Sequence, residues 1–174
     1  MTVTPEALQA LAAGILEACA AKSVMIGTVE SCTGGLVAGT LTEIAGSSHA
    51  MTGGLVTYSN EAKQKLAHVP EEMLNEHGAV SQAVASAMAE GGREPLSADI
   101  CVSITGIAGP GGGSAQKPVG LVHFACAAQG LETAHREERF GDLGRRQVRL
   151  ESVKVALEML AVAADQIPDQ AARP

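Results

Sequence analysis

Ser31 is a candidate nucleophile, because it follows a short apolar stretch and begins a glycine-marked turn in which residues 30–35 read Glu-Ser-Cys-Thr-Gly-Gly. If a helix follows, the amides of Thr33, Gly34 and Gly35 lack intrahelical acceptors. Such amides can hold an oxyanion during acyl transfer. The pattern is not the Gly-x-Ser-x-Gly elbow of the α/β-hydrolases. A simpler interpretation, in which Ser31 or Thr33 caps the helix, stays open.

A serine nucleophile needs a base, and Lys63 is the best-placed residue for that role. It falls about one turn into a short helix predicted to begin near Asn60. Burial favours the neutral amine, which can accept a proton near neutral pH. None of the five histidines convincingly adjoins these segments. The alternative is a solvated helix lysine, which is the preferred interpretation for Lys65.

The loop 106–113 reads Gly-Ile-Ala-Gly-Pro-Gly-Gly-Gly and is too long and irregular for a hairpin turn. Its closely spaced amides suit a phosphate or another anion. The loop matches neither the P-loop nor the dinucleotide fingerprint. Arg145, Arg146 and Arg149 cluster where the last helix is predicted to start, and positive charge there opposes the helix dipole. An anionic ligand would explain both features, but a flexible loop and a solvated basic cluster stay open.

These residues need a scaffold, and the hydrophobic pattern predicts one. Helices are expected at about 5–19, 35–45, 81–90 and 145–165, with a short helix from about residue 60 that carries Lys63 and Lys65, and strands at about 24–29, 54–58, 99–105, 119–127 and 133–140. We expect Gly91 and Gly92 to end the fourth helix and residues 167–174 to fray. The alternation predicts a single α/β domain over residues 1–174, a three-layer α/β/α sandwich with a mixed, mostly parallel sheet of about five strands. Ligands bind such sheets beyond the carboxyl ends of the strands.

Composition excludes several classes of protein. The net charge of -7 argues against nucleic-acid binding, which needs a basic face. The four cysteines form no Cys-x-x-Cys pair, so we expect no metal site and reduced thiols in a cytoplasmic protein. No apolar run reaches the roughly 20 residues that span a bilayer. With only 2% aromatic residues, the core must be built from aliphatic side chains and Met.

Several motifs together carry a resemblance to a known family. They are Glu-Ser-Cys-Thr-Gly-Gly (30–35), Ala-Gly-Ser-Ser (45–48), Thr-Tyr-Ser-Asn-Glu-Ala-Lys (57–63), Gly-Ala-Val-Ser (78–81), Ser-Ile-Thr-Gly-Ile-Ala-Gly-Pro (103–110) and Lys-Pro-Val-Gly (117–120). From about residue 6 to 163, the sequence resembles the CinA C-terminal domain family, the nicotinamide-nucleotide amidohydrolases. Longer CinA proteins carry an additional N-terminal domain that is absent here, so the chain is similar to the stand-alone amidase.

The resemblance implies hydrolysis of nicotinamide mononucleotide to nicotinate mononucleotide and ammonia, with Ser31 as nucleophile and Lys63 as base. We expect the amides of residues 33–35, with Thr105 and Gly106, to hold the oxyanion. Tyr58 would orient Lys63 or the pyridine ring. No metal or organic cofactor is expected. The expected partner is the nucleotide substrate alone, without nucleic acid or membrane, and the chain is expected to form a homo-oligomer.

The substrate phosphate is assigned to Gly109, Gly111 and Gly112 together with Arg145. The family usually has Gly-Asp-Arg before the last helix, whereas residues 141–145 here read Gly-Asp-Leu-Gly-Arg. Counting back from Val148 and Arg149 places Arg145 at the family arginine.

Two rival functions remain at this point. A non-catalytic nucleotide-binding or regulatory module would keep the glycine loop, but it would not need Ser31 and Lys63 together. A thiol enzyme would use Cys32 instead. We expect that side chain to point into packing, and no histidine partner is apparent.

Overall fold

The computed structural model describes residues 3–171, which form alternating helices and strands. The helices are α1 (Pro5–Ala21), α2 (Leu36–Thr42), α3 (Asn60–Ala67), α4 (Glu71–His77), α5 (Gln82–Leu96) and α6 (Arg145–Gln166), with a short 3-10 helix η1 (Ser47–His49). The strands are β1 (Ile26–Glu30), β2 (Met51–Val56), β3 (Ile100–Gly106), β4 (Leu121–Ala128) and β5 (Ala134–Arg139). None of the helices in this part of the chain is both long and apolar enough to cross a bilayer.

The five strands form one mixed sheet in the order β2-β1-β3-β4-β5. β1 pairs in parallel with β2 and β3, whereas β4 pairs antiparallel with β3 and β5. Only β4 therefore runs against the other strands, although the four pairings divide evenly between parallel and antiparallel. The predicted α/β fold with a mixed sheet of about five strands is confirmed.

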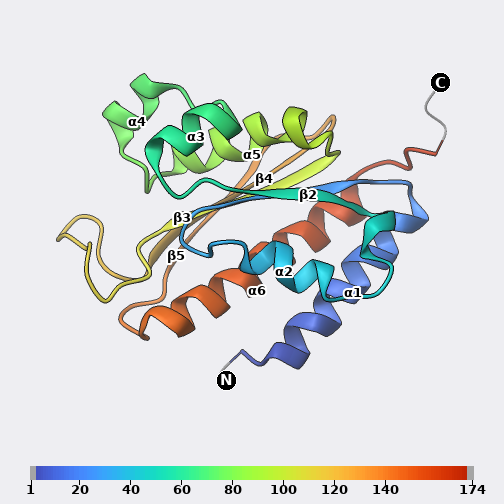
Figure 1. The fold of residues 1–174 in the computed structure, drawn as a ribbon, viewed down its shortest axis with the longest axis horizontal. Coiled ribbons are helices and arrows are strands. Elements are labelled where there is room, and N and C mark those ends of the chain that lie inside the picture. The colour runs from blue at the N-terminus through green and yellow to red at the C-terminus, as the bar shows by residue number, and fades with distance from the viewer. Residues whose placement is uncertain (1–2, 172–174) are drawn as a thin grey trace.

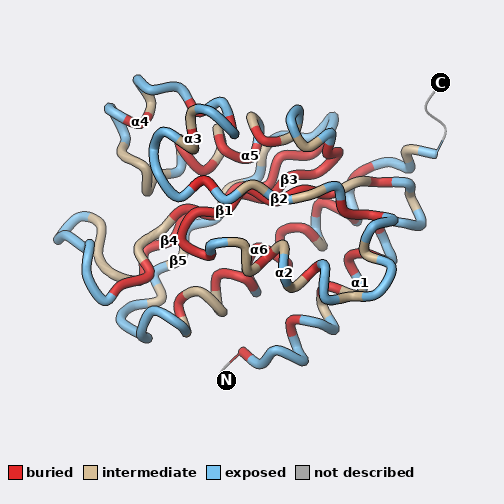
Figure 2. Tube along the Cα trace, viewed as in Figure 1, coloured by how far each residue is buried: buried red, intermediate tan, exposed pale blue. Residues whose placement is uncertain are grey.

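Helices cover both faces of this sheet, which gives three layers (Figure 1). α1, α2 and α6 pack on one face, and α3, α4 and α5 pack on the other. The side chains of β1 and β3 are almost all buried between these layers, and exposed residues lie on the outer sides of the helices (Figure 2). Aliphatic residues and cysteines dominate the larger core beneath α1 and α6, where Phe124 is the one fully buried aromatic side chain among the described residues.

Helix α5 continues through Gly91 and Gly92 to Leu96, so the prediction that these glycines end it is wrong. Both glycines instead allow close packing. A Cβ on Gly91 would collide with the carbonyl oxygen of Ala67, and a Cβ on Gly92 would collide with Val29. Their lack of a side chain lets α5 lie directly against α3 and the sheet.

The two ends of the described chain are anchored. At the N-terminal end, the Thr4 hydroxyl accepts a hydrogen bond from the amide of Ala7 and so caps α1. At the C-terminal end, Ile167 is fully buried and the Gln170 amide donates to the Lys22 carbonyl at 2.8 Å. These contacts hold Ile167 and Gln170 against the rest of the domain, and residues 172–174 lie outside the described part.

Candidate active site

The carboxyl ends of β1, β2 and β3 meet at one edge of the sheet because these strands are parallel. A cavity of about 280 Å³ opens at this edge. It is lined by Ser31, Cys32, Tyr58, Lys63, Ala79, Val80, Thr105, Gly106, Ile107, Ala108, Gly109, Gly111, Gly112 and Arg145. The structure thus brings together most of the predicted site residues, although they come from four separate segments of the chain.

Ser31 follows β1 directly, and its amide donates to the carbonyl of Ile104 on β3 at 2.9 Å. Lys63 lies one turn into α3, which begins where the Ser59 hydroxyl accepts from the amide of Ala62. The Lys63 Nζ atom lies 3.1 Å from the Ser31 Oγ atom, within hydrogen-bonding distance. The predicted pairing of these two side chains is present in the structure. The helix begins at Asn60, as predicted, and Ser59 is its cap.

The Lys63 side chain is enclosed, with only 1% of its surface exposed. Its ammonium also donates to the carbonyl of Thr57 at 2.7 Å, which fixes the nitrogen beside Ser31. Burial disfavours the charged form and lowers the pKa of Lys63 from 10.5 to about 8. A substantial fraction of this amine is therefore neutral near pH 8 and able to accept a proton.

Glu30 is a fully buried carboxylate that sequence reasoning did not assign to any role. It accepts hydrogen bonds from the amides of Gly35, Val37 and Ala38 and from the Thr28 hydroxyl. The carboxylate therefore satisfies the free amides at the start of α2, where a negative charge is also favoured by the helix dipole. The nearby Ser31 is held in a turn that leads into a capped helix.

This arrangement corrects two of the predicted oxyanion donors. The Gly35 amide is bound to Glu30, and the Gly34 amide donates to the Ser31 carbonyl at 3.0 Å. Neither glycine lines the cavity. In the described part of the chain, the amides of Cys32 and Thr33 make no hydrogen bond to another residue, and of these two residues only Cys32 lines the cavity, so its amide is the available donor next to Ser31.

Arg149 holds the Ser31 turn from α6, in the helix layer on the opposite side of the sheet from Lys63. Its guanidinium donates to the carbonyl of Cys32 at 3.1 Å and to the carbonyl of Thr33 at 2.9 Å. The sequence placed Arg149 in a basic cluster but gave no sign that it contacts the turn. The Thr33 hydroxyl is buried and has no partner among the described residues, so Thr33 does not cap α2 through its side chain.

The segment that follows β3 forms another wall of the cavity, in addition to the Ser31 turn and Lys63. The Thr105 hydroxyl donates to the Ala79 carbonyl at 2.8 Å, which joins β3 to the segment before α5. Gly106, Gly109, Gly111 and Gly112 form the adjoining wall. Gly109 and Gly112 have φ angles of 78° and 84°, which other residues rarely adopt. The glycine loop thus lies beside Ser31, as predicted.

Arg145 and Tyr58 close the mouth of the cavity. The Arg145 guanidinium donates to the carbonyl of Gly109 at 2.9 Å and to the Tyr58 hydroxyl at 3.1 Å. The ammonium of Lys63 contacts Ser31 and Thr57 rather than Tyr58. The possibility that Tyr58 orients Lys63 through a hydrogen bond is therefore not realised, and Tyr58 remains at the rim with 62% of its surface exposed.

Cys32 is a poor nucleophile in this setting. Its side chain is buried in the core cluster, and burial raises the pKa of the thiol to about 12. Because the thiolate is the reactive form, this environment argues against the thiol-enzyme alternative.

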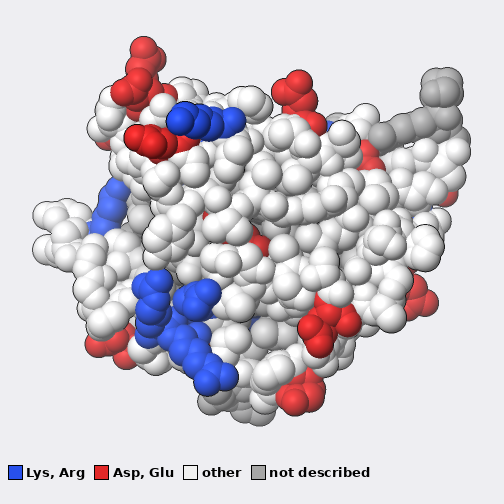
Figure 3. Space-filling view, viewed as in Figure 1, with Lys and Arg blue, Asp and Glu red and all other residues white. Residues whose placement is uncertain are grey.

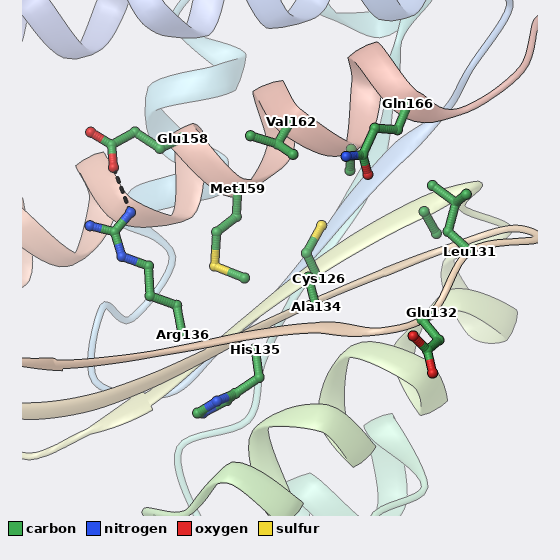
Figure 4. A pocket seen from close by; sticks show the side chains of 12 residues that line it. Cys126, Leu131, Glu132, Ala134, His135, Arg136, Glu158, Met159, Val162 and Gln166 are labelled. Atoms are coloured by element: carbon green, nitrogen blue, oxygen red, sulfur yellow. Dashed lines mark hydrogen bonds and ion pairs between the residues drawn. The ribbon is translucent and has the colours of Figure 1, made fainter.

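A second hollow, of about 290 Å³, lies between β5 and α6 (Figure 4). Met159 reaches from α6 toward the sheet there, and Cys126 reaches from β4 toward the helix. Burial raises the pKa of the Cys126 thiol to about 12, and Arg136 is paired with Glu158 at 2.8 Å. These groups offer no nucleophile and base. The residues from 3 to 171 contain no group of three or more His, Cys, Asp or Glu that could hold a metal ion.

Comparison with known proteins gives consistent relationships. The model of the CinA C-terminal domain matches residues 8–163. A CinA-like protein of Synechococcus sp. (strain RCC307) is 49% identical over 151 residues, which is 86% of this chain and 36% of the relative. A putative competence-damage inducible protein of Moorella thermoacetica is 48% identical over 81% of this chain and 34% of its own length. The chain thus spans about a third of the length of these curated relatives.

Solved structures cover the chain more completely. The competence/damage inducible protein CihA from Agrobacterium tumefaciens is 48% identical and superposes with a TM-score of 0.89, over 95% of this chain and 99% of that one. A CinA superfamily protein from Escherichia coli is 30% identical, with a TM-score of 0.86 over 93% of this chain and 94% of its own. The same arrangement of helices and strands therefore occurs as a separate chain of similar size.

Proposed function

The chain belongs to the CinA C-terminal domain family, and from this premise we propose that it is an amidohydrolase that releases ammonia from nicotinamide mononucleotide. The observation that carries the proposal is the buried contact between the Lys63 Nζ atom and the Ser31 Oγ atom at 3.1 Å. A serine beside a partly neutral lysine is equipped for covalent acyl transfer without a histidine.

In the proposed reaction, neutral Lys63 removes the hydroxyl proton of Ser31 as the Ser31 oxygen attacks the carboxamide carbon. The Cys32 amide, which is free and belongs to a residue lining the cavity, is the candidate donor for the resulting oxyanion. Lys63 then gives this proton to the amide nitrogen, and the carbon–nitrogen bond breaks to release ammonia. Water attacks the acyl-enzyme, releases nicotinate mononucleotide and restores the Ser31 hydroxyl.

The rest of the cavity suits the remote part of a mononucleotide. The glycine loop supplies amides beside Ser31, and Arg145 adds a positive charge at the mouth. Together they would bind the phosphate while the carboxamide reaches Ser31. Binding energy from this distant group would position the reacting carbon.

The direct test is ammonia release by the purified protein supplied with nicotinamide mononucleotide, with nicotinate mononucleotide identified as the second product. The Ser31→Ala variant is the control for contaminating activity. The proposal fails if the folded wild-type protein releases no more ammonia than this variant.

A further inference from the structure

Three guanidinium groups near the start of α6 surround a hollow of about 490 Å³ that adjoins the cavity of Ser31. The residues that line it are Leu36, Arg145, Arg146, Arg149 and Leu150, and we call it the arginine hollow. A compact basic patch covers this region on the face drawn in Figure 3. The patch is opposite in sign to the net charge of -7 of the whole chain.

The positive charge of this hollow is not neutralised by the protein. Within residues 3–171, none of its three arginines forms an ion pair with a carboxylate. Arg136 and Arg139 on β5, by contrast, are both paired with glutamates at 2.6–2.8 Å. The Arg146 side chain makes no hydrogen bond to any described residue and is exposed. The three like charges therefore repel one another unless an anion lies between them.

Two of these guanidinium groups are fixed in place by uncharged oxygen atoms. Arg145 donates to the Gly109 carbonyl and the Tyr58 hydroxyl, and Arg149 donates to the two carbonyls that follow Ser31. These bonds orient the groups but leave their charge available. An anion that enters the hollow would thus meet a partly preorganised site and would need to order mainly Arg146.

The chemistry of the hollow favours a pyrophosphate group. Guanidinium groups bind phosphate oxygens in bidentate fashion, and three of them around one space match an ion with several negative charges. Leu36 and Leu150 add an apolar wall, which can accommodate an organic part of the ligand. We propose that the arginine hollow binds the pyrophosphate group of a nucleoside diphosphate, at a site that adjoins the cavity of Ser31 and shares Arg145 with it.

The test is isothermal titration calorimetry of the full chain with inorganic pyrophosphate and, separately, with ADP. We expect saturable binding of one ion per chain, weakened about tenfold by Arg146→Ala and more strongly by Arg146→Glu. Lys65→Glu is the matched control for Arg146→Glu, because Lys65 is exposed on α3 and both substitutions change the net charge by the same amount. The measurement involves no turnover, so its outcome is independent of the proposed amidase activity.

Comparison of ADP with inorganic pyrophosphate shows whether the hollow recognises the nucleoside as well as the phosphates. Tighter binding of ADP than of pyrophosphate supports contacts between the nucleoside and the apolar wall, and equal binding supports recognition of the phosphates alone. Absence of saturable binding overturns the proposal. Binding that is unchanged in Arg146→Glu, or equally weakened in Lys65→Glu, also overturns it, since the anion would then occupy another site or respond only to net charge.

Discussion

The side-chain nitrogen of Lys63 lies 3.1 Å from the hydroxyl oxygen of Ser31, although the two residues are 32 positions apart in the chain. Ser31 is fixed by β1 and by its contact with β3, whereas Lys63 reaches it from α3, in the helix layer that also contains α4 and α5. The surrounding apolar groups keep water from the ammonium and lower its pKa. Proximity and burial together make this pair chemically distinct from an exposed serine and lysine.

Replacement of the nucleophile is the first test of the mechanism. Ser31→Ala should reduce ammonia release by about 10⁴-fold or more, because the attacking oxygen is removed. Cys32→Ala should retain most of the activity, since the Cys32 thiol is neutral in its buried site. Steady-state rates with nicotinamide mononucleotide measure both effects. An inactive Cys32→Ala together with an active Ser31→Ala would contradict the serine mechanism.

The role of Lys63 as a base can be separated from its positive charge. Lys63→Arg keeps the charge but cannot release a proton near neutral pH, so its kcat should be almost as low as that of Lys63→Ala. Lys65→Ala should have a mild effect because Lys65 is exposed on the same helix. Circular dichroism should accompany the kinetics to show that the variants are folded. High activity of Lys63→Arg would leave Lys63 with an electrostatic role only.

The pH dependence follows from the pKa of Lys63, which burial lowers to about 8. Only the neutral amine can accept the proton of Ser31, and its fraction falls tenfold for each pH unit below that value. We expect kcat/KM to rise with pH, to bend near pH 8 and to level off above it. The residual activity of Lys63→Ala should lack this bend. A wild-type profile that falls as pH rises through 8 would argue against a neutral lysine base.

Recognition of the phosphate can be tested with a shorter substrate. Nicotinamide riboside lacks the phosphate and should show a much lower kcat/KM than the mononucleotide. Arg145→Ala should narrow this difference, because Arg145 lies at the mouth beside the glycine loop. Equal values of kcat/KM for the two substrates would remove the phosphate site. An unchanged ratio in Arg145→Ala would remove only Arg145 from it.

Glu30 should matter for stability as well as for activity. In Glu30→Gln, one oxygen becomes an amide group that faces the amide donors of α2, so some of these hydrogen bonds are lost. The free energy of unfolding should fall by about 2–4 kcal/mol. The kcat should fall more than KM rises, because the Ser31 turn loses its anchor. Urea denaturation and steady-state kinetics measure the two effects, with the exposed Glu43→Gln as control.

Much of this site could be predicted from the sequence, because glycine and polar segments mark the ends of three strands. Parallel strands bring such ends together, so Ser31, Lys63 and the loop 106–113 could be placed in one region without knowledge of the side-chain contacts. The roles of Glu30 and Arg149 could not be predicted in this way. Glu30 reaches the amides of α2, and Arg149 reaches the carbonyls of the Ser31 turn. The spacing of residues along the chain does not reveal such side-chain directions.

The ends of helices are also difficult to predict from the sequence alone. A pair of glycines is a common sign that a helix ends, but Gly91 and Gly92 lie inside α5 because neighbouring elements approach them closely. Local propensity gave the wrong end of this helix because tertiary packing determined it. Contacts between residues distant in sequence also act beyond the end of α6, where Lys22 donates to the Ile167 carbonyl.

The close approach at Gly91 also bears on the reacting groups. α5 touches α3 at the carbonyl of Ala67, one turn beyond Lys63 on the same helix. A methyl group added at Gly91 would push this end of α3 away from α5. Since Lys63 moves with α3 while Ser31 stays with the sheet, such a push would change the separation of the two side chains. The close packing of α5 against α3 at Gly91 thus helps to set the distance over which the proton moves, and a substitution that touches neither Ser31 nor Lys63 can alter the rate.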